Sequence, residues 1–210
     1  MIGCYNYTVI LTYFGLAVSI YGMVLALGGD QRTAMACLVI AGLCDAFDGK
    51  VARSKKNRTE MEKNFGIQID SLCDLICFGM FPAVVAYSLN IHAAIMIIFV
   101  LAGVIRLAYF NVTEEERQKE EGGKRKYYQG FPITSSSIFL PIIYAALHLA
   151  RIRTGFAYVE PVFAVVMTVL AILFVLDIKV KKPNNGELAV LSISAIAVFV
   201  ILNVMISMSE

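Results

Sequence analysis

Four aspartates lie at helical spacing in one stretch of the chain: Asp45 and Asp48, three residues apart, and Asp70 and Asp74, four residues apart. On a helix of 3.6 residues per turn, each pair lies on one face. If the two helices pack with these faces inward, four carboxylates meet, and they need cations to offset their repulsion in an apolar setting. Oxygen ligands favour Mg²⁺ or Mn²⁺, with Ca²⁺ as a further candidate, over zinc or copper. The spacing therefore predicts a divalent metal site.

A carboxylate cluster of this size could hold two ions. Two ions suit displacement at phosphorus, because they neutralise phosphate oxygens and stabilise the leaving group. The alternative is structural: the four aspartates could merely pair with Lys50, Arg53 and Arg106. Intramembrane carboxylates usually mark a site, and four acids exceed what such pairing requires.

The composition predicts a membrane protein. The chain has 210 residues, of which 59% are hydrophobic and 16% charged, and its mean hydropathy is +0.73. The charges fall in a few clusters separated by apolar runs of about twenty residues, the length that crosses a bilayer. We therefore expect an all-α, polytopic transmembrane helix bundle, surrounded by membrane lipid and without a nucleic-acid partner.

Seven apolar segments are predicted, each long enough for one helix. Pro132 suits the first turn of the fifth segment, and Pro82 and Pro141 are expected to kink theirs. Neighbouring helices would then cover the carbonyl groups that the prolines leave without a donor. The segments are Tyr7–Leu27, Thr33–Arg53, Gly66–Leu89, Ile91–Val112, Ile133–Ala150, Phe156–Ile178 and Leu188–Met208.

The basic residues predict the topology. Fourteen lie on the side of the bundle that holds the aspartate cluster, and only Arg32, Arg151 and Arg153 lie on the other. By the positive-inside rule, the richer side is cytoplasmic. We expect a multi-pass protein of the cytoplasmic membrane, with its N-terminus inside, its C-terminus outside and the aspartates opening toward the cytoplasm.

The five cysteines give no disulfide framework, since their number is odd and they lie mostly inside apolar runs. Cys73 and Cys77 are one turn apart beside the aspartates, so a thiolate metal site is an alternative. Packing as small buried hydrophobic side chains is the commoner role of such cysteines. His92 and His148 are expected near the outer face, away from the aspartates.

The aspartate stretch resembles the CDP-alcohol phosphotransferase family, whose pattern is D-x-x-D-G-x-x-A-R followed by G-x-x-x-D-x-x-x-D. Twelve residues separate Arg53 from Gly66, more than is usual in the family, and this polar surplus is interpreted as a longer surface loop. The resemblance implies a six-helix membrane domain over residues 1–183. Residues 184–210 would then form an additional C-terminal transmembrane helix.

The resemblance also implies roles for individual residues. Asp45, Asp48 and Asp70 would be metal ligands, and Asp74 a metal ligand or the catalytic general base. The nucleotide-binding residues would be Asp48, Gly49, Ala52, Arg53 and Gly66. For the small residues, ordinary close packing of membrane helices is an equal alternative.

Two further stretches, Arg106–Val112 and Tyr128–Pro132, resemble motifs of the bacterial-type phosphatidylserine synthase branch of this family. That resemblance implies transfer of the phosphatidyl group from CDP-diacylglycerol to the hydroxyl of L-serine, with release of CMP. Arg106, Asn111 and Lys126 would bind serine or phosphate. The family resemblance also suggests a homodimer.

Two alternatives remain open from the sequence. The acceptor could be another alcohol, such as glycerol 3-phosphate or an inositol phosphate, although a phosphorylated acceptor calls for a denser basic pocket. Intramembrane aspartates also mark ion pathways, so a divalent cation transporter is a second alternative. Against it, the acids cluster at one end of the membrane, with no second acidic set across the bilayer.

Overall fold

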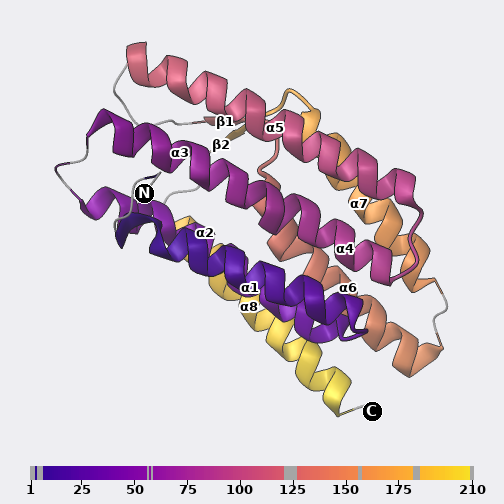
Figure 1. Ribbon diagram of the computed structural model, residues 1–210. Helices are drawn as coiled ribbons and strands as arrows, with labels where there is room; N and C mark the ends of the chain where they lie inside the picture. The colour runs from indigo at the N-terminus through magenta and orange to yellow at the C-terminus, as the bar shows by residue number, and fades with distance from the viewer. Residues whose placement is uncertain are drawn as a thin grey trace.

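The computed structural model describes residues 3, 7–55, 57, 59–120, 127–155, 158–181 and 185–208. Within these ranges, every predicted segment overlaps a helix, which confirms the all-α bundle (Figure 1). The helices are η1 (Tyr7–Val9), α1 (Ile10–Leu27), α2 (Gln31–Ser54), α3 (Glu60–Asp74), η2 (Leu75–Met80), α4 (Phe81–Ser88), α5 (Ala93–Glu120), η3 (Ile133–Ser135), α6 (Ser136–Thr154), α7 (Val159–Val175) and α8 (Asn185–Ser207). Two short strands, β1 (Tyr127–Gln129) and β2 (Lys179–Lys181), pair antiparallel.

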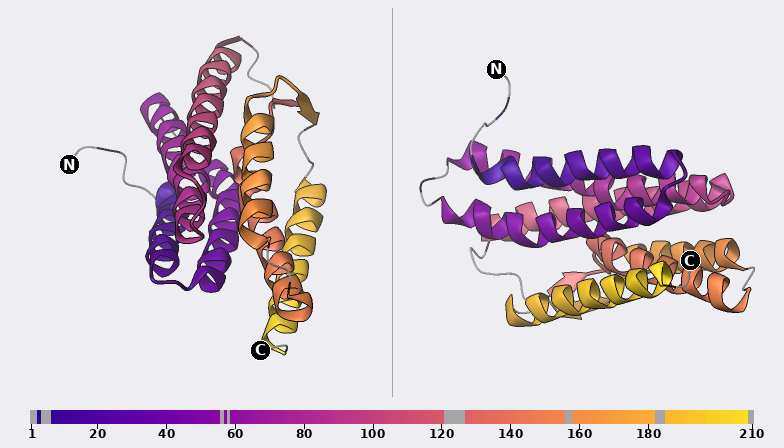
Figure 2. Two further views of the ribbon diagram at one scale, coloured as in Figure 1. Left: turned by 90° about the vertical axis from the view of Figure 1, so that its right-hand side faces the viewer. Right: turned by 90° about the horizontal axis from the view of Figure 1, so that it is seen from below.

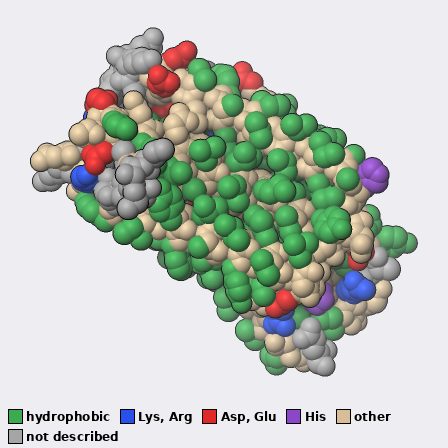
Figure 3. Space-filling model, viewed as in Figure 1, with side chains coloured by type: hydrophobic (Ala, Val, Ile, Leu, Met, Phe, Trp, Pro, Cys, Tyr) green, Lys and Arg blue, Asp and Glu red, His purple; other side chains and the backbone are tan. Residues whose placement is uncertain are grey.

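Four of the seven predicted segments have the length and hydropathy of membrane spans in the described residues, and those at α2, α7 and α8 do not reach them. Among the described residues, four helical stretches are long and apolar enough to cross a bilayer: Tyr7–Leu27, Glu60–Ser88, Ala93–Glu116 and Ile133–Thr154. On the face shown in Figure 3, apolar side chains cover the middle of the molecule and charged ones gather toward its ends. An apolar belt between polar ends is the surface of an integral membrane protein.

The connection between α2 and α3 differs from the predicted long loop. Helix α2 continues to Ser54 and α3 begins at Glu60, so seven of the twelve residues between Arg53 and Gly66 are helical. The Thr59 hydroxyl accepts a hydrogen bond from the Glu62 N–H (3.2 Å), and the Glu62 carboxylate accepts one from the Thr59 N–H (3.0 Å). This capping box satisfies two amide groups at the start of α3. Its Thr-x-x-Glu pattern is visible in the sequence.

At Pro82, the interruption takes the form of a π-helical turn. The helix that begins with α3 widens into η2 and returns to α-helical geometry at Phe81, with Pro82 in the first turn of α4. Proline has no N–H to donate to the carbonyl group four residues earlier, which is that of Phe78. The Ser136 hydroxyl on α6 donates to that carbonyl oxygen at 3.0 Å, so a neighbouring helix covers it, as predicted.

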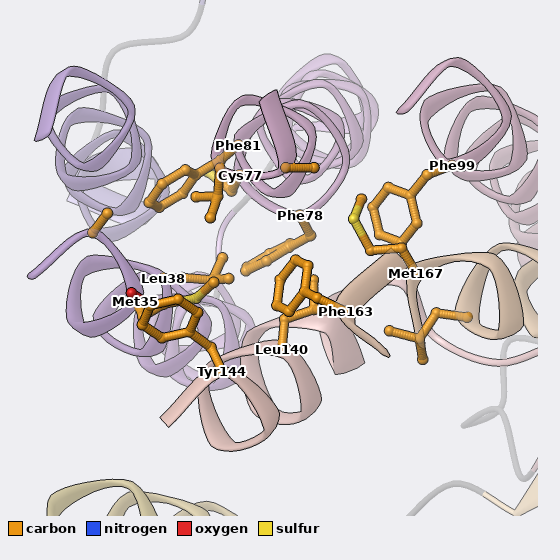
Figure 4. Close-up of a cluster of buried hydrophobic side chains, with 14 of the residues drawn as sticks. Met35, Leu38, Cys77, Phe78, Phe81, Phe99, Leu140, Tyr144, Phe163 and Met167 are labelled. Atoms are coloured by element: carbon orange, nitrogen blue, oxygen red, sulfur yellow. The ribbon is translucent and has the colours of Figure 1, made fainter. Parts of the chain in front are cut away.

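The bundle has two parts around a core of aromatic and sulfur-containing side chains. Figure 2 shows α1 to α5 on one side and α6 to α8 on the other. Phe78 and Phe163 are almost fully buried where the two parts meet, and Phe81 is almost fully buried beside α1 (Figure 4). Gly22 on α1 lies directly against Phe81, where any side chain would overlap the ring. Small residues allow such close approach where all helix surfaces are equally apolar.

Helix α8 covers the predicted C-terminal segment, and it packs on α6 and reaches α2. The Arg32 guanidinium at the start of α2 donates to the Asn203 side-chain oxygen (2.8 Å), the Asn203 carbonyl oxygen (2.7 Å) and the Ser207 hydroxyl (2.9 Å). These acceptors lie in the last turns of α8, where the carbonyl groups attract a cation. Arg32 therefore fastens α8 to the helix that carries Asp45 and Asp48.

The start of α2 is set by Asp30, which gives a first prediction. The Thr33 side chain and N–H both hydrogen-bond the Asp30 carboxylate (N–H to oxygen, 3.0 Å) and hold its pKa below the ordinary value. A lowered pKa in the folded state stabilises the fold above about pH 4, and this contribution is lost as the pH falls through the folded-state pKa. Asp30→Ala should therefore cost about 1 kcal/mol at pH 7 and less at pH 3, where part of the Asp30 carboxylate is protonated.

Thermal unfolding of the detergent-solubilised chain at both pH values measures this difference. Asp177→Ala, at an exposed position between α7 and β2, is the matched control and should leave the midpoint unchanged. An equal loss of stability at pH 7 and pH 3 would contradict the capping role of Asp30.

Candidate active site

The structure brings the aspartates of α2 and α3 together, as the spacing predicted. One carboxylate oxygen from each of Asp45, Asp70 and Asp74 lies within 4.8 Å of the others. Asp45 contacts Asp74 through their carboxyl groups, and Asp48 contacts Asp70 in the same way. Asp48 is the most buried of the cluster, at 8% exposure.

This cross-pairing follows from antiparallel helices. Moving three residues along α2, from Asp45 to Asp48, corresponds to moving four residues back along α3, from Asp74 to Asp70. Both steps complete about one turn of an α-helix, so the paired carboxylates stay level with each other. The two facing rows of aspartates, one on α2 and one on α3, thus form one cluster of acids.

Carboxylates in contact inside an apolar bundle require a shared proton or a cation. Among the described side chains, no lysine or arginine forms an ion pair with Asp45, Asp70 or Asp74. Lys50 instead lies over the Phe47 ring, 5.1 Å from its centroid. The described residues therefore give no support to the interpretation of these aspartates as structural ion-pair partners.

The donor set fits a hard divalent cation. Ligand oxygens sit about 2.1 Å from Mg²⁺ and about 2.4 Å from Ca²⁺, so oxygens on opposite sides of one ion are about 4 to 5 Å apart. The three carboxylate oxygens lie within 4.8 Å of one another, so their separations do not exceed this span. The clustered ligands are all oxygens. The buried free thiols of Cys44, Cys73 and Cys77 are not among them, which argues against the thiolate alternative.

Asp48 is oriented by a residue that the sequence did not reveal. The Thr12 hydroxyl on α1 donates to one Asp48 carboxylate oxygen at 3.1 Å. Groups that hydrogen-bond a ligating carboxylate fix its direction and raise the affinity for metal. Thr12 lies 36 residues from Asp48, and nothing in a helix-spacing pattern connects them.

The small residues of the motif extend the two rows of aspartates along α2 and α3. Gly49 and Ala52 follow Asp45 by four and seven residues on α2, and Gly66 precedes Asp70 by four residues on α3. Each set therefore lies on the same helical face as its aspartates. All three small residues are partly exposed. The Arg53 side chain and Lys126 lie outside the described part of the structure.

Asn111 is placed beside the acidic helix. Its side-chain oxygen accepts a hydrogen bond from the Ser71 hydroxyl (2.7 Å), and its amide nitrogen lies 3.4 Å from the Gln68 side-chain oxygen. Ser71 directly follows Asp70, so Asn111 joins α5 to α3 next to the carboxylate cluster. Neither Ser71 nor Gln68 was a predicted site residue.

Arg106 points in a different direction from Asn111. Five residues along an α-helix correspond to faces about 140° apart. The Arg106 side chain is buried at 6% exposure, and its Nε donates to the Phe131 carbonyl oxygen at 3.2 Å. Its guanidinium also lies over the Phe110 ring, 5.7 Å from the centroid. The structure therefore places Arg106 against the segment that leads into α6, not beside Asn111.

Gly130 explains how that segment approaches so closely. It has a φ of +78°, and a side chain there would meet the Phe174 carbonyl oxygen at 3.0 Å and Arg106 Nε at 3.2 Å. The Gly130 N–H donates to the Ile178 carbonyl oxygen at 2.8 Å. A glycine is required at this point, both for the left-handed backbone and for the space.

A membrane helix bundle with converging carboxylates is the architecture of a metal-dependent membrane enzyme, and the comparison with known families agrees. The sequence model described as CDP-alcohol phosphatidyltransferase matches residues 5–176. The chain therefore belongs to this family, as the aspartate motif predicted. The family is metal-dependent, and the aspartate cluster of this chain supplies suitable ligands.

Several curated proteins are similar to the chain. A CDP-diacylglycerol–serine O-phosphatidyltransferase of Saccharomyces cerevisiae is 38% identical over 113 residues, or 50% of this chain and 40% of the relative. An archaetidylserine synthase of Methanothermobacter thermautotrophicus is 30% identical over 168 residues, or 78% and 64% of the two chains. A CDP-diacylglycerol–serine O-phosphatidyltransferase of Mycobacterium bovis is 25% identical over 199 residues, or 89% and 66%. The matched region thus spans about 40 to 66% of these relatives.

The contact between Thr12 and Asp48 gives a second prediction. Thr12→Val keeps the shape of the side chain and removes the hydroxyl, so Asp48 loses one of its orienting groups. We expect Mn²⁺ binding to weaken about tenfold, measured by electron paramagnetic resonance titration of the purified chain. Thr168→Val is the control, because the Thr168 hydroxyl donates only to the Ala164 carbonyl of its own helix. Equal Mn²⁺ affinity in both variants would remove Thr12 from the site.

Proposed function

We propose that this protein transfers the phosphatidyl group of CDP-diacylglycerol to the hydroxyl of L-serine and releases CMP. The observation that carries the proposal is the cross-pairing of Asp45 with Asp74 and of Asp48 with Asp70, which builds a carboxylate cluster between two membrane helices. Such a cluster suits the binding of cations that in turn hold a pyrophosphate.

The choice of serine rests on similarity. The relatives from yeast and Mycobacterium bovis carry names that specify CDP-diacylglycerol and serine, and the archaeal relative is named a synthase of a serine-containing lipid. The two motifs that resemble the phosphatidylserine synthase branch, at Arg106–Val112 and Tyr128–Pro132, point to the same acceptor.

In the proposed mechanism, Asp45, Asp48, Asp70 and Asp74 hold one or two divalent ions, Mg²⁺ or Mn²⁺. The metal, when bound, neutralises phosphate oxygens and stabilises the leaving phosphate. Gly49, Ala52 and Gly66 leave room for the nucleotide to approach the backbone of α2 and α3, and Arg53 lies one residue beyond Ala52.

In the proposed reaction, serine attacks the phosphatidyl group directly. The serine hydroxyl oxygen forms a bond to the phosphorus of the phosphatidyl group while the bond from that phosphorus to the oxygen bridging it to CMP breaks. The hydroxyl proton passes to Asp74, which acts as general base, and CMP leaves with the electron pair of the broken bond. Because two reactants are held side by side, the reaction avoids much of the entropic cost of their encounter.

The proposed arrangement in the membrane follows the charge distribution. By the positive-inside rule, the basic residues that flank the aspartates support a cytoplasmic position for the cluster, with the N-terminus inside. CMP and serine would exchange with the cytoplasm, and the acyl chains would enter from the lipid between helices. A homodimer is part of the proposal on the strength of the family resemblance alone.

For the acceptor we propose Arg106, Asn111 and Lys126. Asn111 is supported by its place beside Ser71, one residue from Asp70. Arg106 rests on the motif resemblance and on the two-pronged geometry with which a guanidinium holds a carboxylate or phosphate, since its Nε donates to the Phe131 carbonyl oxygen, away from Asn111. Lys126 rests on the sequence alone.

The function is tested by CMP release. Purified protein with labelled CDP-diacylglycerol is expected to release CMP and form phosphatidylserine only when serine is present, and chelation with EDTA should abolish both. Added Mg²⁺ or Mn²⁺ should restore them. Asp74→Asn is the matched inactive variant, since it keeps the size of the side chain and removes the charge.

Other outcomes identify the alternatives. If product forms with glycerol 3-phosphate or an inositol phosphate and none forms with serine, the acceptor is a different alcohol and the transfer chemistry is unchanged. Proteoliposomes that take up Mg²⁺ without ever releasing CMP would indicate a cation transporter and end the enzymatic proposal.

Arg106 gives a separate prediction about the acceptor. Arg106→Lys keeps the charge and loses the planar fork, so we expect the KM for serine to rise about tenfold, in line with the loss of one charge-assisted hydrogen bond. The KM for CDP-diacylglycerol should stay within about twofold. A uniform fall in kcat with both KM values unchanged would assign Arg106 to holding the Gly130–Phe131 segment instead.

A further inference from the structure

The first turn of α6 contacts α2, which carries Asp45 and Asp48, and the π-helical turn η2, which directly follows α3. On the α2 side, Ser137 packs directly on Gly42, and a methyl group on Gly42 would overlap both the Cβ and the Oγ of Ser137. Gly42 lies three residues before Asp45, so this contact is one turn from the first acid of the cluster. The start of α6 therefore fixes how closely it approaches α2.

On the other side, the same turn is bonded to the π-helical segment. The Ser136 hydroxyl donates to the Phe78 carbonyl oxygen, and both residues are almost fully buried, at 0% and 1% exposure. Phe78 lies four residues after Asp74. A buried carbonyl group without a donor would cost about 1 to 3 kcal/mol, so this hydrogen bond stabilises the backbone where Pro82 removes the usual partner.

Ile133, just before the first turn of α6, contacts α5 and the π-helical turn. Its Cδ1 atom lies 2.7 Å from where a Cβ on Gly103 of α5 would be, and 3.7 Å from the same position on Gly79 of η2. The side chain thus occupies the space that two glycines leave between α5 and the π turn. Ile133, Ser136 and Ser137 together form a wedge, which contacts α2, η2 and α5.

The π turn matters because it changes the direction of the helix faces. A π turn contains about one residue more than an α turn, and one residue corresponds to about 100° of rotation on an α-helix. The insertion lets Asp70 and Asp74 face α2 while Phe78 and Phe81, further along, face the core. A return to regular α-helix would rotate one of these two faces away from its partner.

We propose that the wedge of Ile133, Ser136 and Ser137 sets the separation and rotation of the two aspartate helices, and that Ser136 is a positioning residue for the carboxylate cluster. The proposal rests on the metal-binding part of the proposed function. It does not depend on which alcohol is the acceptor. Ser136 acts through the Phe78 carbonyl and the π turn, without touching substrate or metal.

Ser136→Ala and Ser135→Ala form a matched pair of variants. The two serines are adjacent and buried, but the Ser135 hydroxyl has no hydrogen-bond partner among the described residues. We expect Ser136→Ala to weaken Mn²⁺ binding about tenfold, measured by calorimetric titration of the full-length chain in detergent. It should raise the Mg²⁺ concentration needed for half-maximal CMP release to a similar extent. Ser135→Ala should leave both within about twofold.

The outcomes distinguish a positioning role of Ser136 from a contribution to stability alone. A lower unfolding temperature with unchanged Mn²⁺ affinity in Ser136→Ala would overturn the proposal, as would an equal loss of affinity in Ser135→Ala. If the wild-type chain binds Mn²⁺ but does not use serine, the proposed function fails and the wedge is still tested. If the wild-type chain does not bind Mn²⁺, both proposals fail.

A second variant covers the case in which Ser136→Ala is too unstable to purify. Pro82→Ala in that background supplies an N–H for the Phe78 carbonyl, so the fold can be satisfied by an ordinary α turn. Recovered stability with Mn²⁺ affinity still reduced would support the wedge, because the π turn would be lost. Recovery of both the stability and the Mn²⁺ affinity would show that the only role of the Ser136 hydroxyl is to hydrogen-bond the Phe78 carbonyl group.

Discussion

The repulsion among carboxylates held inside an apolar bundle is the constraint on which the structure depends. Each of the helices α2 and α3 could place its two acids toward water at a membrane surface, yet the fold pairs Asp45 with Asp74 and Asp48 with Asp70. Such an arrangement is stable only with cations or shared protons between the acids. The same need for cations makes the cluster suitable for holding a pyrophosphate.

The surrounding structure orients the carboxylates by hydrogen bonds and close packing. Thr12 bonds Asp48 from α1, and Ser71 bonds Asn111 across to α5. Ser136 satisfies the carbonyl group that Pro82 leaves without a donor. In an apolar surrounding, a polar group without a partner is costly, so these few hydrogen bonds add to the close packing that holds the helices together.

Helix α8 lies beyond the region that the family model matches, which ends at residue 176. It packs on α6, the helix that carries Ser136 and Ser137 of the wedge, and Arg32 fastens its last turns to the start of α2. The helix thus contacts two elements that position the cluster, although its described residues contribute no acid to it.

The sequence by itself determined the helical membrane bundle, the family and the convergence of the four aspartates, because apolar length and the 3.6-residue repeat are local properties of the chain. It also contained the capping box at Thr59, whose pattern was there to be recognised. Only the tertiary structure revealed the Thr12 hydrogen bond, the π turn after Asp74, the different directions of Arg106 and Asn111, and the wedge at the start of α6. These depend on how distant helices pack, and packing distances between segments are not written in the spacing of residues along one helix.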